Sequence, residues 1–292
     1  MAGGRVMKIV GALAGLAAVA DGSQVQQAHL SGRASGVAAL AHEGKRSGGF
    51  VRGLEFKHRL RICNAYPFSA ALDVFRGRGE RLTGDGPMAY KDCRDFAAPL
   101  KAGDRLEFKV GDVQAGTFSV SDLPNNDAVL LLVIHRHDSS STAVSFESHV
   151  FASLQNAQIA VIDTYKGKAK ARTRILDTAK KVKADGTPDT TPPRSEELRF
   201  DSVVAVNQGR YEVDLEGLDG APKAKRQLVA LDRESYVVMR TGVEAEGGDS
   251  FPEELVVYPQ SPDEMLHSAA EMRSAMPALA LALAVVVSAF VA

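Results

Sequence analysis

The stretch that decides the fold is Leu60–Phe75, which reads LRICNAYPFSAALDVF. Apolar and polar residues alternate in it twice, first over Leu60–Cys63 and again over Leu72–Phe75. Because successive side chains of a β-strand point to opposite faces, each alternating run predicts a strand with one buried face.

The alternation continues along the chain and is interrupted by glycine-rich turns. It recurs at Leu106–Val110 and Thr117–Val120, whereas Ala128–His135 is continuously apolar until its end, as a central strand would be. Turn signals separate these runs at Gly77–Gly79, Gly84–Pro87 and Ala102–Asp104. Short strands at regular spacing predict an all-β chain of antiparallel, immunoglobulin-like β-sandwiches rather than an α/β fold.

A second copy of this pattern follows in the same order. Its segments that match the first copy are Gln158–Asp163, Leu198–Phe200, Gly209–Leu215 and Tyr236–Arg240. We therefore predict two tandem β-sandwich modules, residues 57–138 and residues 143–260. The serine-rich stretch near Asp138–Thr142 is the predicted linker, and the proline-rich residues 185–193 form a predicted loop in the second module.

Residues 1–20 have the features of a cleavable signal peptide. Arg5 and Lys8 precede an apolar helical run from Ile9 to Ala20, which ends on the small residues expected at a cleavage site. A buried N-terminal helix is the alternative. Residues 21–56 are rich in Gly, Ser, Ala and Gln and predict a flexible arm. Because this arm is also poor in acidic residues, bipartite targeting to a plastid is a second interpretation.

The C-terminus carries a second processing pattern. A linker and anchor segment, residues 261–277, precedes an apolar tail, residues 278–292. Small residues at Ser268–Ala270, a polar spacer and a terminal apolar tail are typical of a glycolipid-anchor signal, with Ser268 as the attachment residue. A retained C-terminal membrane helix and a buried helix are the alternatives. The first two interpretations tether the protein to a membrane, at the extracellular face of the plasma membrane or within the secretory pathway.

Composition argues against several functions. The formal net charge of −1 predicts no binding of nucleic acid, and the absence of Trp excludes a tryptophan platform for sugars. The common motifs for hydrolase, metalloprotease, nucleotide-binding and thiol-redox sites do not occur in the sequence. We expect no catalytic residues and no cofactor, with an enzyme of unrecognised site as the alternative. His135 and His137, with Asp138 or His149 nearby, fix too few ligands for a metal site, so no metal is expected.

Cys63 and Cys93 are the only cysteines of the chain. In an exported protein both would be oxidised, so we predict a structural disulfide between neighbouring strands, with two buried thiols as the alternative. Closing a loop of about 31 residues would stabilise the fold by roughly 3 to 4 kcal/mol on the chain-entropy model.

Cations occupy every second position over one stretch of the second module. They are Lys166, Lys168, Lys170, Arg172 and Arg174. On a strand these five side chains would share one face and present a stripe to anionic polysaccharide or lipid headgroups. The alternative is a charged edge strand that prevents edge-to-edge aggregation.

Arg61–Pro67, followed by Leu72–Phe75, resembles the opening of secreted bacterial β-sandwich repeats of unknown function, which begin with a hydrophobic-x-hydrophobic-x-Asn-Ala-x-Pro strand and turn. The layout of a Gly-rich arm and two modules is similar to the alginate acetylation accessory family AlgF. That resemblance implies a non-catalytic protein that bridges acetyltransfer components in the periplasm. The C-terminal anchor signal departs from both families.

From these observations we expect a non-catalytic, membrane-tethered module for binding, adhesion or scaffolding outside the cytoplasm. Its expected partners are a membrane, an anionic polysaccharide or a surface protein. An accessory to polysaccharide acetylation is the alternative.

Overall fold

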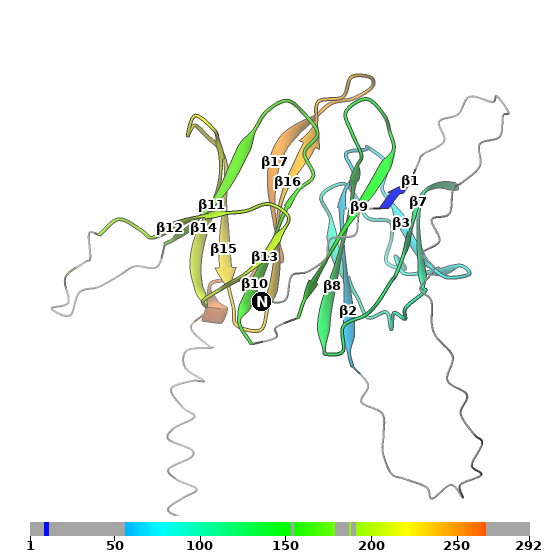
Figure 1. Ribbon diagram of the computed structural model, residues 1–292, viewed down its shortest axis with the longest axis horizontal. Helices are drawn as coiled ribbons and strands as arrows, with labels where there is room; N and C mark the ends of the chain where they lie inside the picture. Colours follow the sequence, from blue (N-terminus) through cyan, green and yellow to red (C-terminus); the bar gives the residue numbers. More distant parts are fainter. Residues whose placement is uncertain (1–8, 12–55, 153–154, 179–186, 188–190, 267–292) are drawn as a thin grey trace, which may run out of the picture. The chain divides into compact units, whose positions relative to one another are not determined.

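The computed structural model describes residues 9–11, 56–152, 155–178, 187 and 191–266 (Figure 1). Most of the predicted signal peptide and arm, the attachment residue Ser268 and the apolar tail, residues 278–292, lie outside the described residues. Residues 9–11, which we expected to be helical, form a short strand, β1 (Ile9–Gly11), because Ile and Val favour extended backbone beside a sheet edge.

The regular secondary structure of the described part of the chain is almost wholly β-strand, as expected, and its strands form four sheets (Figure 1). The first sandwich consists of two of them. One has the order β1, β9 (Val144–Phe151), β8 (Ala128–Arg136), β2 (His58–Ala65), β5 (Cys93–Phe96). The other has the order β4 (Glu80–Arg81), β3 (Asp73–Arg76), β6 (Arg105–Val110), β7 (Val113–Ser119).

The second sandwich consists of the other two sheets. One has the order β13 (Ser202–Val206), β10 (Ala157–Asp163), β16 (Ser235–Val243), β17 (Phe251–Tyr258). The other has the order β12 (Ser195–Leu198), β11 (Ala171–Asp177), β14 (Gly209–Gly217), β15 (Pro222–Ala230). Leaving β1 aside, each strand of the first sandwich has a counterpart at the same place in the second.

The prediction of wholly antiparallel, immunoglobulin-like sheets is wrong in one respect. β2 pairs in parallel with β8, and β10 pairs in parallel with β16, so each sandwich contains one parallel pair. The first strand of each sandwich enters the centre of its sheet, whereas the first strand of an immunoglobulin sheet lies at an edge. The central position suits β2 and β10 because most of their residues are buried.

The two sandwiches also share the turn that follows their first strand. The backbone N–H of Tyr66 donates to Asn64 Oδ1, and that of Tyr165 donates to Asp163 Oδ1, both over 3.1 Å. Asn and Asp side chains form such turns because they accept from the backbone two residues ahead. The Asn64-Ala65-Tyr66 segment quoted for the bacterial resemblance is therefore a turn that the second sandwich repeats.

The predicted boundary between the modules is misplaced. β9, which the sequence assigned to the second module, pairs along its length with β8 of the first sandwich. The change from one sandwich to the other therefore falls between Phe151 and Ala157. Residues 137–143 form the turn of the β8–β9 hairpin, in which Asp138 Oδ1 accepts hydrogen bonds from the backbone N–H groups of Ser140 and Ser141. The Asp and Ser residues of this turn were misread as a linker.

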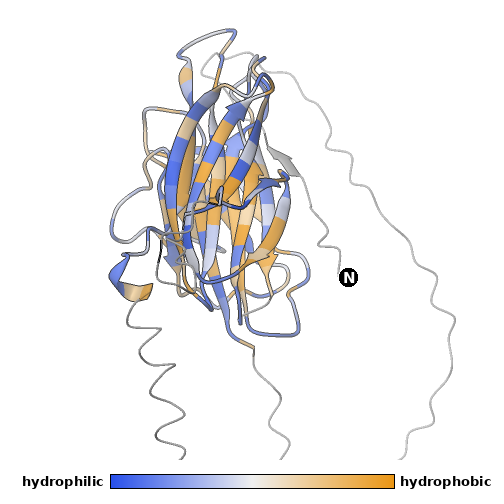
Figure 2. Cartoon of the chain, turned by 90° about the vertical axis from the view of Figure 1, so that its left-hand side faces the viewer, coloured by the Kyte–Doolittle hydropathy of each residue, from blue (hydrophilic) through white to orange (hydrophobic). Residues whose placement is uncertain are grey.

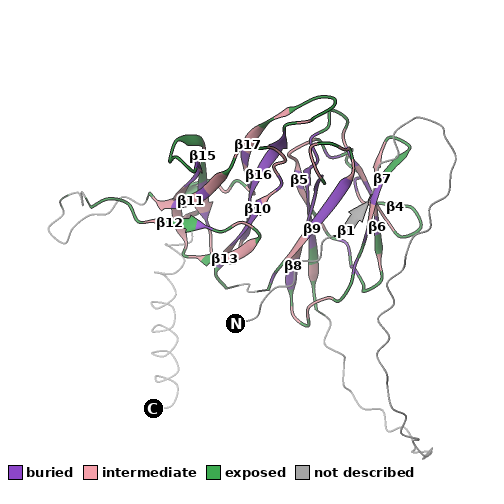
Figure 3. Ribbon diagram, turned by 45° about the horizontal axis from the view of Figure 1, so that its top comes forward, coloured by how far each residue is buried: buried purple, intermediate pink, exposed green. Residues whose placement is uncertain are grey.

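Among the residues that the structure describes, buried apolar side chains form three clusters, two of them inside the sandwiches. Leu106, Phe108 and Phe146 belong to the cluster of the first, and Val213, Leu215 and Tyr236 to that of the second. The outer strands alternate between hydrophilic and hydrophobic residues (Figure 2). β16 is buried at every residue, because the third cluster covers the other face of its sheet (Figure 3).

One buried hydroxyl distinguishes the two inner cores. Val74 on β3 pairs with Phe108, and Thr173 at the corresponding place on β11 pairs with Leu215; both side chains are inaccessible to solvent. Thr173 Oγ1 has no hydrogen-bond partner among the described residues. A buried hydroxyl without a partner costs free energy that an isosteric methyl group does not.

We therefore predict that Thr173→Val raises the free energy of unfolding by about 1 kcal/mol. The reverse exchange in the first sandwich, Val74→Thr, should lower it by a similar amount. Urea denaturation of both variants measures the effect, and a loss of stability in Thr173→Val would show that the hydroxyl is in fact bonded.

Candidate binding site

The third apolar cluster joins the two sandwiches. It contains Leu131 and Val133 of β8 and Phe151 of β9 on one side, and Ile162 of β10 and Met239 of β16 on the other. We call this contact, between the sheet of β2, β5, β8 and β9 and the sheet of β10, β13, β16 and β17, the seam. Both of these sheets are therefore covered on both faces, which explains the continuously apolar run in β8.

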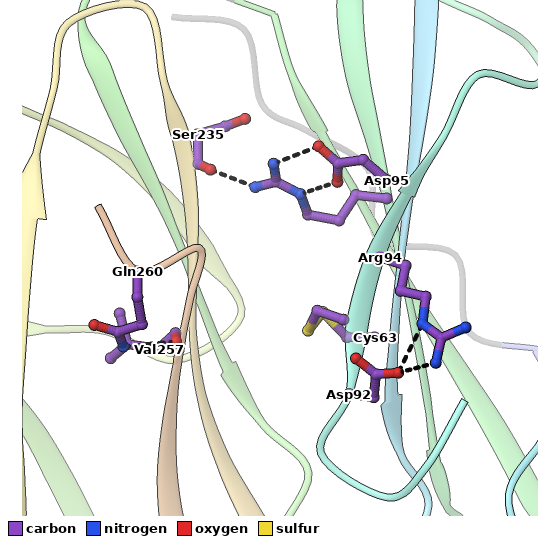
Figure 4. The surroundings of a disulfide bond; sticks show 9 residues. Cys63, Asp92, Arg94, Asp95, Ser235, Val257 and Gln260 are labelled. Atoms are coloured by element: carbon purple, nitrogen blue, oxygen red, sulfur yellow. Dashed lines mark hydrogen bonds and ion pairs between the residues drawn. A yellow bond between two sulfur atoms is a disulfide. The ribbon is translucent and has the colours of Figure 1, made fainter. Parts of the chain in front are cut away.

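The disulfide predicted from the two cysteines is confirmed, and it lies in the seam. Cys63 on β2 and Cys93 on β5 stand directly opposite each other, with Cα atoms 4.1 Å apart, and their sulfur atoms are bonded (Figure 4). Both residues are buried in the cluster shared by the two sandwiches. The bond therefore fixes β5 to β2 at the face that the second sandwich covers.

A buried arginine bridges the sandwiches beside the disulfide. Arg61, 2% exposed, donates to both carboxylate oxygens of Asp95, at 2.6 and 2.9 Å, and to the backbone carbonyl of Ser235 in the second sandwich (Figure 4). Its guanidinium also lies over the ring of Tyr258, 5.1 Å from the centroid. From the sequence, Arg61 was expected on the polar face of a half-buried strand; its carboxylate, carbonyl and aromatic partners come from distant segments.

Two further polar contacts cross the seam near β17. Lys91 Nζ donates to both oxygens of Glu254 at 3.0 Å, and Tyr90 Oη lies 3.0 Å from Thr241 Oγ1. The ring of Tyr90 also meets Phe251 edge-on. Lys91 has a backbone φ of 72°, a left-handed conformation that non-glycine residues rarely adopt. Tyr90 and Lys91 belong to the segment between β4 and β5, in which the sequence predicted a turn at Gly84–Pro87.

A cleft of about 700 Å³ opens where the seam reaches the ends of β8 and β16. The β8–β9 and β16–β17 hairpins lie side by side there (Figure 1), and the backbone N–H of Glu246 donates to the carbonyl of Ser139 over 2.9 Å. The first sandwich contributes the segment His137–Ser139, and the second contributes Tyr165–Lys168 and Glu244–Glu246. The cleft thus needs loops of both sandwiches.

A tyrosine–carboxylate pair lines the cleft. Tyr165 Oη donates to Glu244 Oε1 over 2.5 Å, and the backbone N–H of Lys168 donates to Glu244 Oε2 over 3.0 Å. Burial and the hydrogen bond to Glu244 raise the pKa of Tyr165, while the Lys168 N–H holds the pKa of Glu244 below its ordinary value. Arg240 lies beneath the Tyr165 ring, 4.3 Å from its centroid.

The pair leaves no room for a side chain at Gly167. A Cβ atom there would lie 2.5 Å from Tyr165 Oη and 2.8 Å from Glu244 Cδ. The glycine therefore lets the Lys166–Lys168 segment pass close to the pair and present the Lys168 N–H to Glu244.

A second fixed carboxylate, Asp138, lines the cleft from the first sandwich. Asp138 accepts from Ser140 and Ser141, and these hydrogen bonds, above all the one from the Ser141 backbone N–H, lower its pKa to about 2. Asp138 and Glu244 are therefore both ionised at neutral pH, in positions set by backbone donors. Ser139 Oγ donates to Glu246 Oε1 over 3.3 Å and joins the two hairpins.

The structure divides the predicted cationic stripe. Lys166 and Lys168 line the cleft, and Lys170 is exposed just before β11. Only Arg172 and Arg174 lie on a strand, where they approach Glu216 of β14 at 3.3 and 3.9 Å. The five cations therefore do not share one strand face, because the chain becomes regular only at Ala171.

The alternative interpretation of the stripe as an edge strand is also wrong. β11 lies between β12 and β14, and the edges of this sheet are β12 and β15. Exposed charges lie on both edge strands: Glu196 and Glu197 on β12, and Lys223, Lys225 and Arg226 on β15. The edge protection that we expected of β11 therefore belongs to these two strands. Alternating charge alone could not distinguish an edge strand from a central strand whose cations face a row of acidic residues.

The predicted histidines are held by hydrogen bonds in separate places. His137 Nδ1 lies 2.8 Å from Ser145 Oγ, and His149 Nε2 lies 2.7 Å from Glu147 Oε1. Within the described ranges, no group of three or more His, Cys, Asp or Glu side chains could hold a metal ion.

Comparison with known proteins finds neither a matching family model nor a matching curated protein. The resemblance of the Arg61–Pro67 segment to bacterial repeats therefore stays a prediction. No helix among the described residues is long and apolar enough to cross a membrane.

Replacing both cysteines, Cys63→Ala with Cys93→Ala, should lower the free energy of unfolding by roughly 3 kcal/mol or more, since the closed loop is lost and two seam side chains shrink. Urea denaturation measures the loss. The matched control is the double variant Val113→Ala with Val150→Ala, because both valines are exposed, and it should shift the midpoint little. Equal losses in the two variants would contradict the structural role of the bond.

Proposed function

We propose that this chain is a non-catalytic binding module that works outside the cytoplasm, tethered to a membrane, and that its two sandwiches are tandem repeats acting as one unit. The cleft at the end of the seam carries this proposal, because it exists only when loops of both sandwiches are held together. Loops on a rigid β-scaffold are common places for binding sites.

The chemistry of the cleft favours a hydroxyl-rich ligand, and we propose a polysaccharide chain. Asp138 and Glu244 are fixed acceptors for hydroxyl groups, and Lys166 and Lys168 supply donors. Three carboxylates face two ammonium groups, so the cleft has no excess of positive charge that would favour a densely anionic polymer. An acidic sugar would be accommodated where its carboxylate meets Lys168, which is exposed.

The disulfide supports a location outside the cytoplasm, because reducing compartments keep such thiols free. The signal-peptide and anchor patterns of the two termini point to the same location, at the cell surface or in the secretory pathway. A polysaccharide site is equally suited to the alternative role of accessory in polysaccharide acetylation, in which the chain would hold the polymer for a separate enzyme.

Ligand binding is tested by electrophoresis through gels that contain neutral or anionic polysaccharides. We expect retardation of the wild-type chain and a loss of affinity of about tenfold or more in Glu244→Gln, since a hydrogen bond to a charged group contributes roughly 1.5 to 3 kcal/mol. Lys170→Ser is the control, because Lys170 is exposed and does not line the cleft. Retardation that survives Glu244→Gln and Lys168→Ser would refute the cleft as the site.

Location is tested by expressing the full chain in a eukaryotic host and treating intact cells with phosphatidylinositol-specific phospholipase C. Release of protein that lacks the peptide of residues 278–292 is the expected result. Protein that stays in the cytosol with free thiols would contradict the proposed location.

A further inference from the structure

The side of the seam formed by β9 holds a buried acidic group in an unusual setting. Glu147 lies at the middle of β9 and is 2% exposed. Its Oε1 atom lies 2.7 Å from His149 Nε2 on the same strand face, and Asp201, from the turn between β12 and β13, is close enough for its charge to act on Glu147. We call Glu147, His149 and Asp201 the acid–imidazole cluster.

The seam is built differently at its other edge, near β5 and β17. There the acidic side chains of Asp95 and Glu254 form ion pairs with Arg61 and Lys91, respectively. In the part of the chain that the structure describes, neither lysine nor arginine forms an ion pair with Glu147. The strands that pack around it present mainly apolar side chains to the seam, among them Val133 of β8, Ala160 of β10 and Val203 of β13. The other titratable side chain on the seam face of β8 next to it is His135, which is buried and opposite Ser145.

These surroundings make the charge of Glu147 costly. Burial is the main cause that raises its pKa, the hydrogen bond from His149 opposes the shift, and the negative charge of Asp201 adds to it. An imidazole carries a compensating positive charge only in acid. Ionised Glu147 therefore lies buried near a second carboxylate, without a permanently charged partner to compensate it among the described residues.

We propose that the acid–imidazole cluster makes the seam pH-responsive, holding the two sandwiches firmly together in acid and loosening their contact as the pH rises. The sign follows from proton linkage. The folded chain binds the proton of Glu147 more tightly than the unfolded chain does, so this contribution is complete below about pH 4.5, the ordinary value for glutamate, and is lost at higher pH. Because the cleft needs both sandwiches, its affinity for ligand would fall over the same range, a consequence that rests on the proposed function.

The test is the melting temperature of Glu147→Gln and of the wild type between pH 4.5 and pH 8.5. Glutamine keeps the shape of the side chain and cannot ionise. We expect similar melting temperatures at pH 4.5 and a gap in favour of the variant that widens by roughly 3 °C or more toward pH 8.5. Asp201→Asn should give a smaller gap of the same sign. Glu197→Gln is the control, because Glu197 is exposed on β12.

Amide hydrogen exchange locates the effect. After correction for the intrinsic dependence on pH, exchange in β9 and β13 of the wild type should rise with pH relative to β6 and β14, and the rise should vanish in Glu147→Gln. A gap that does not change with pH, or exchange that rises equally in all four strands, would overturn the proposal. Neither experiment uses a ligand, so the outcome is independent of whether the cleft binds polysaccharide.

Discussion

The seam is the constraint on which the remaining features depend. Two sheets that would each face water on one side instead bury that side against each other, through side chains such as Leu131, Val133 and Met239. Transfer of this apolar surface from water is the main driving force for the contact, and Arg61 at its border stays buried because Asp95 and the Ser235 carbonyl satisfy its donors. Only with the seam closed do the two hairpins meet and form a cleft.

The two sandwiches have the same strand order but differ in the contacts at the end where the cleft lies. Tyr66 and Tyr165 follow equivalent strands and each ties the next connection to the last hairpin of its sandwich. Tyr66 donates to the backbone carbonyl of Thr142, whereas Tyr165 donates to the carboxylate of Glu244. The second arrangement leaves an ionised, fixed acceptor in the cleft. The tie itself is structural in both sandwiches, and the difference in acceptor is what makes the second one a candidate for binding.

Much of the fold could be predicted from periodicity, and most of the site could not. Alternation located β2, β3 and β6, the apolar run located β8, and the order of repeated segments matched β10, β14 and β16 correctly. The parallel pairs and the assignment of β9 depend on contacts distant in sequence, which a local pattern does not encode. Likewise Lys166 and Lys168 were singled out for a regular spacing, yet they line the cleft because Gly167 lets their loop approach Glu244. One local signal could have pointed to Tyr165 as a site residue. The turn sequence Asn64-Ala65-Tyr66 of the first sandwich recurs as Asp163-Thr164-Tyr165 in the second.

The most direct test of this account is equilibrium unfolding in urea, followed by hydrogen exchange and mass spectrometry in both sandwiches at pH 5. If the seam makes them one cooperative unit, peptides from β6 and from β14 will lose protection at the same urea concentration, in a single transition. Two separate midpoints, with one sandwich still protected after the other has unfolded, would show that the sandwiches are independent and that the seam does not hold the cleft together.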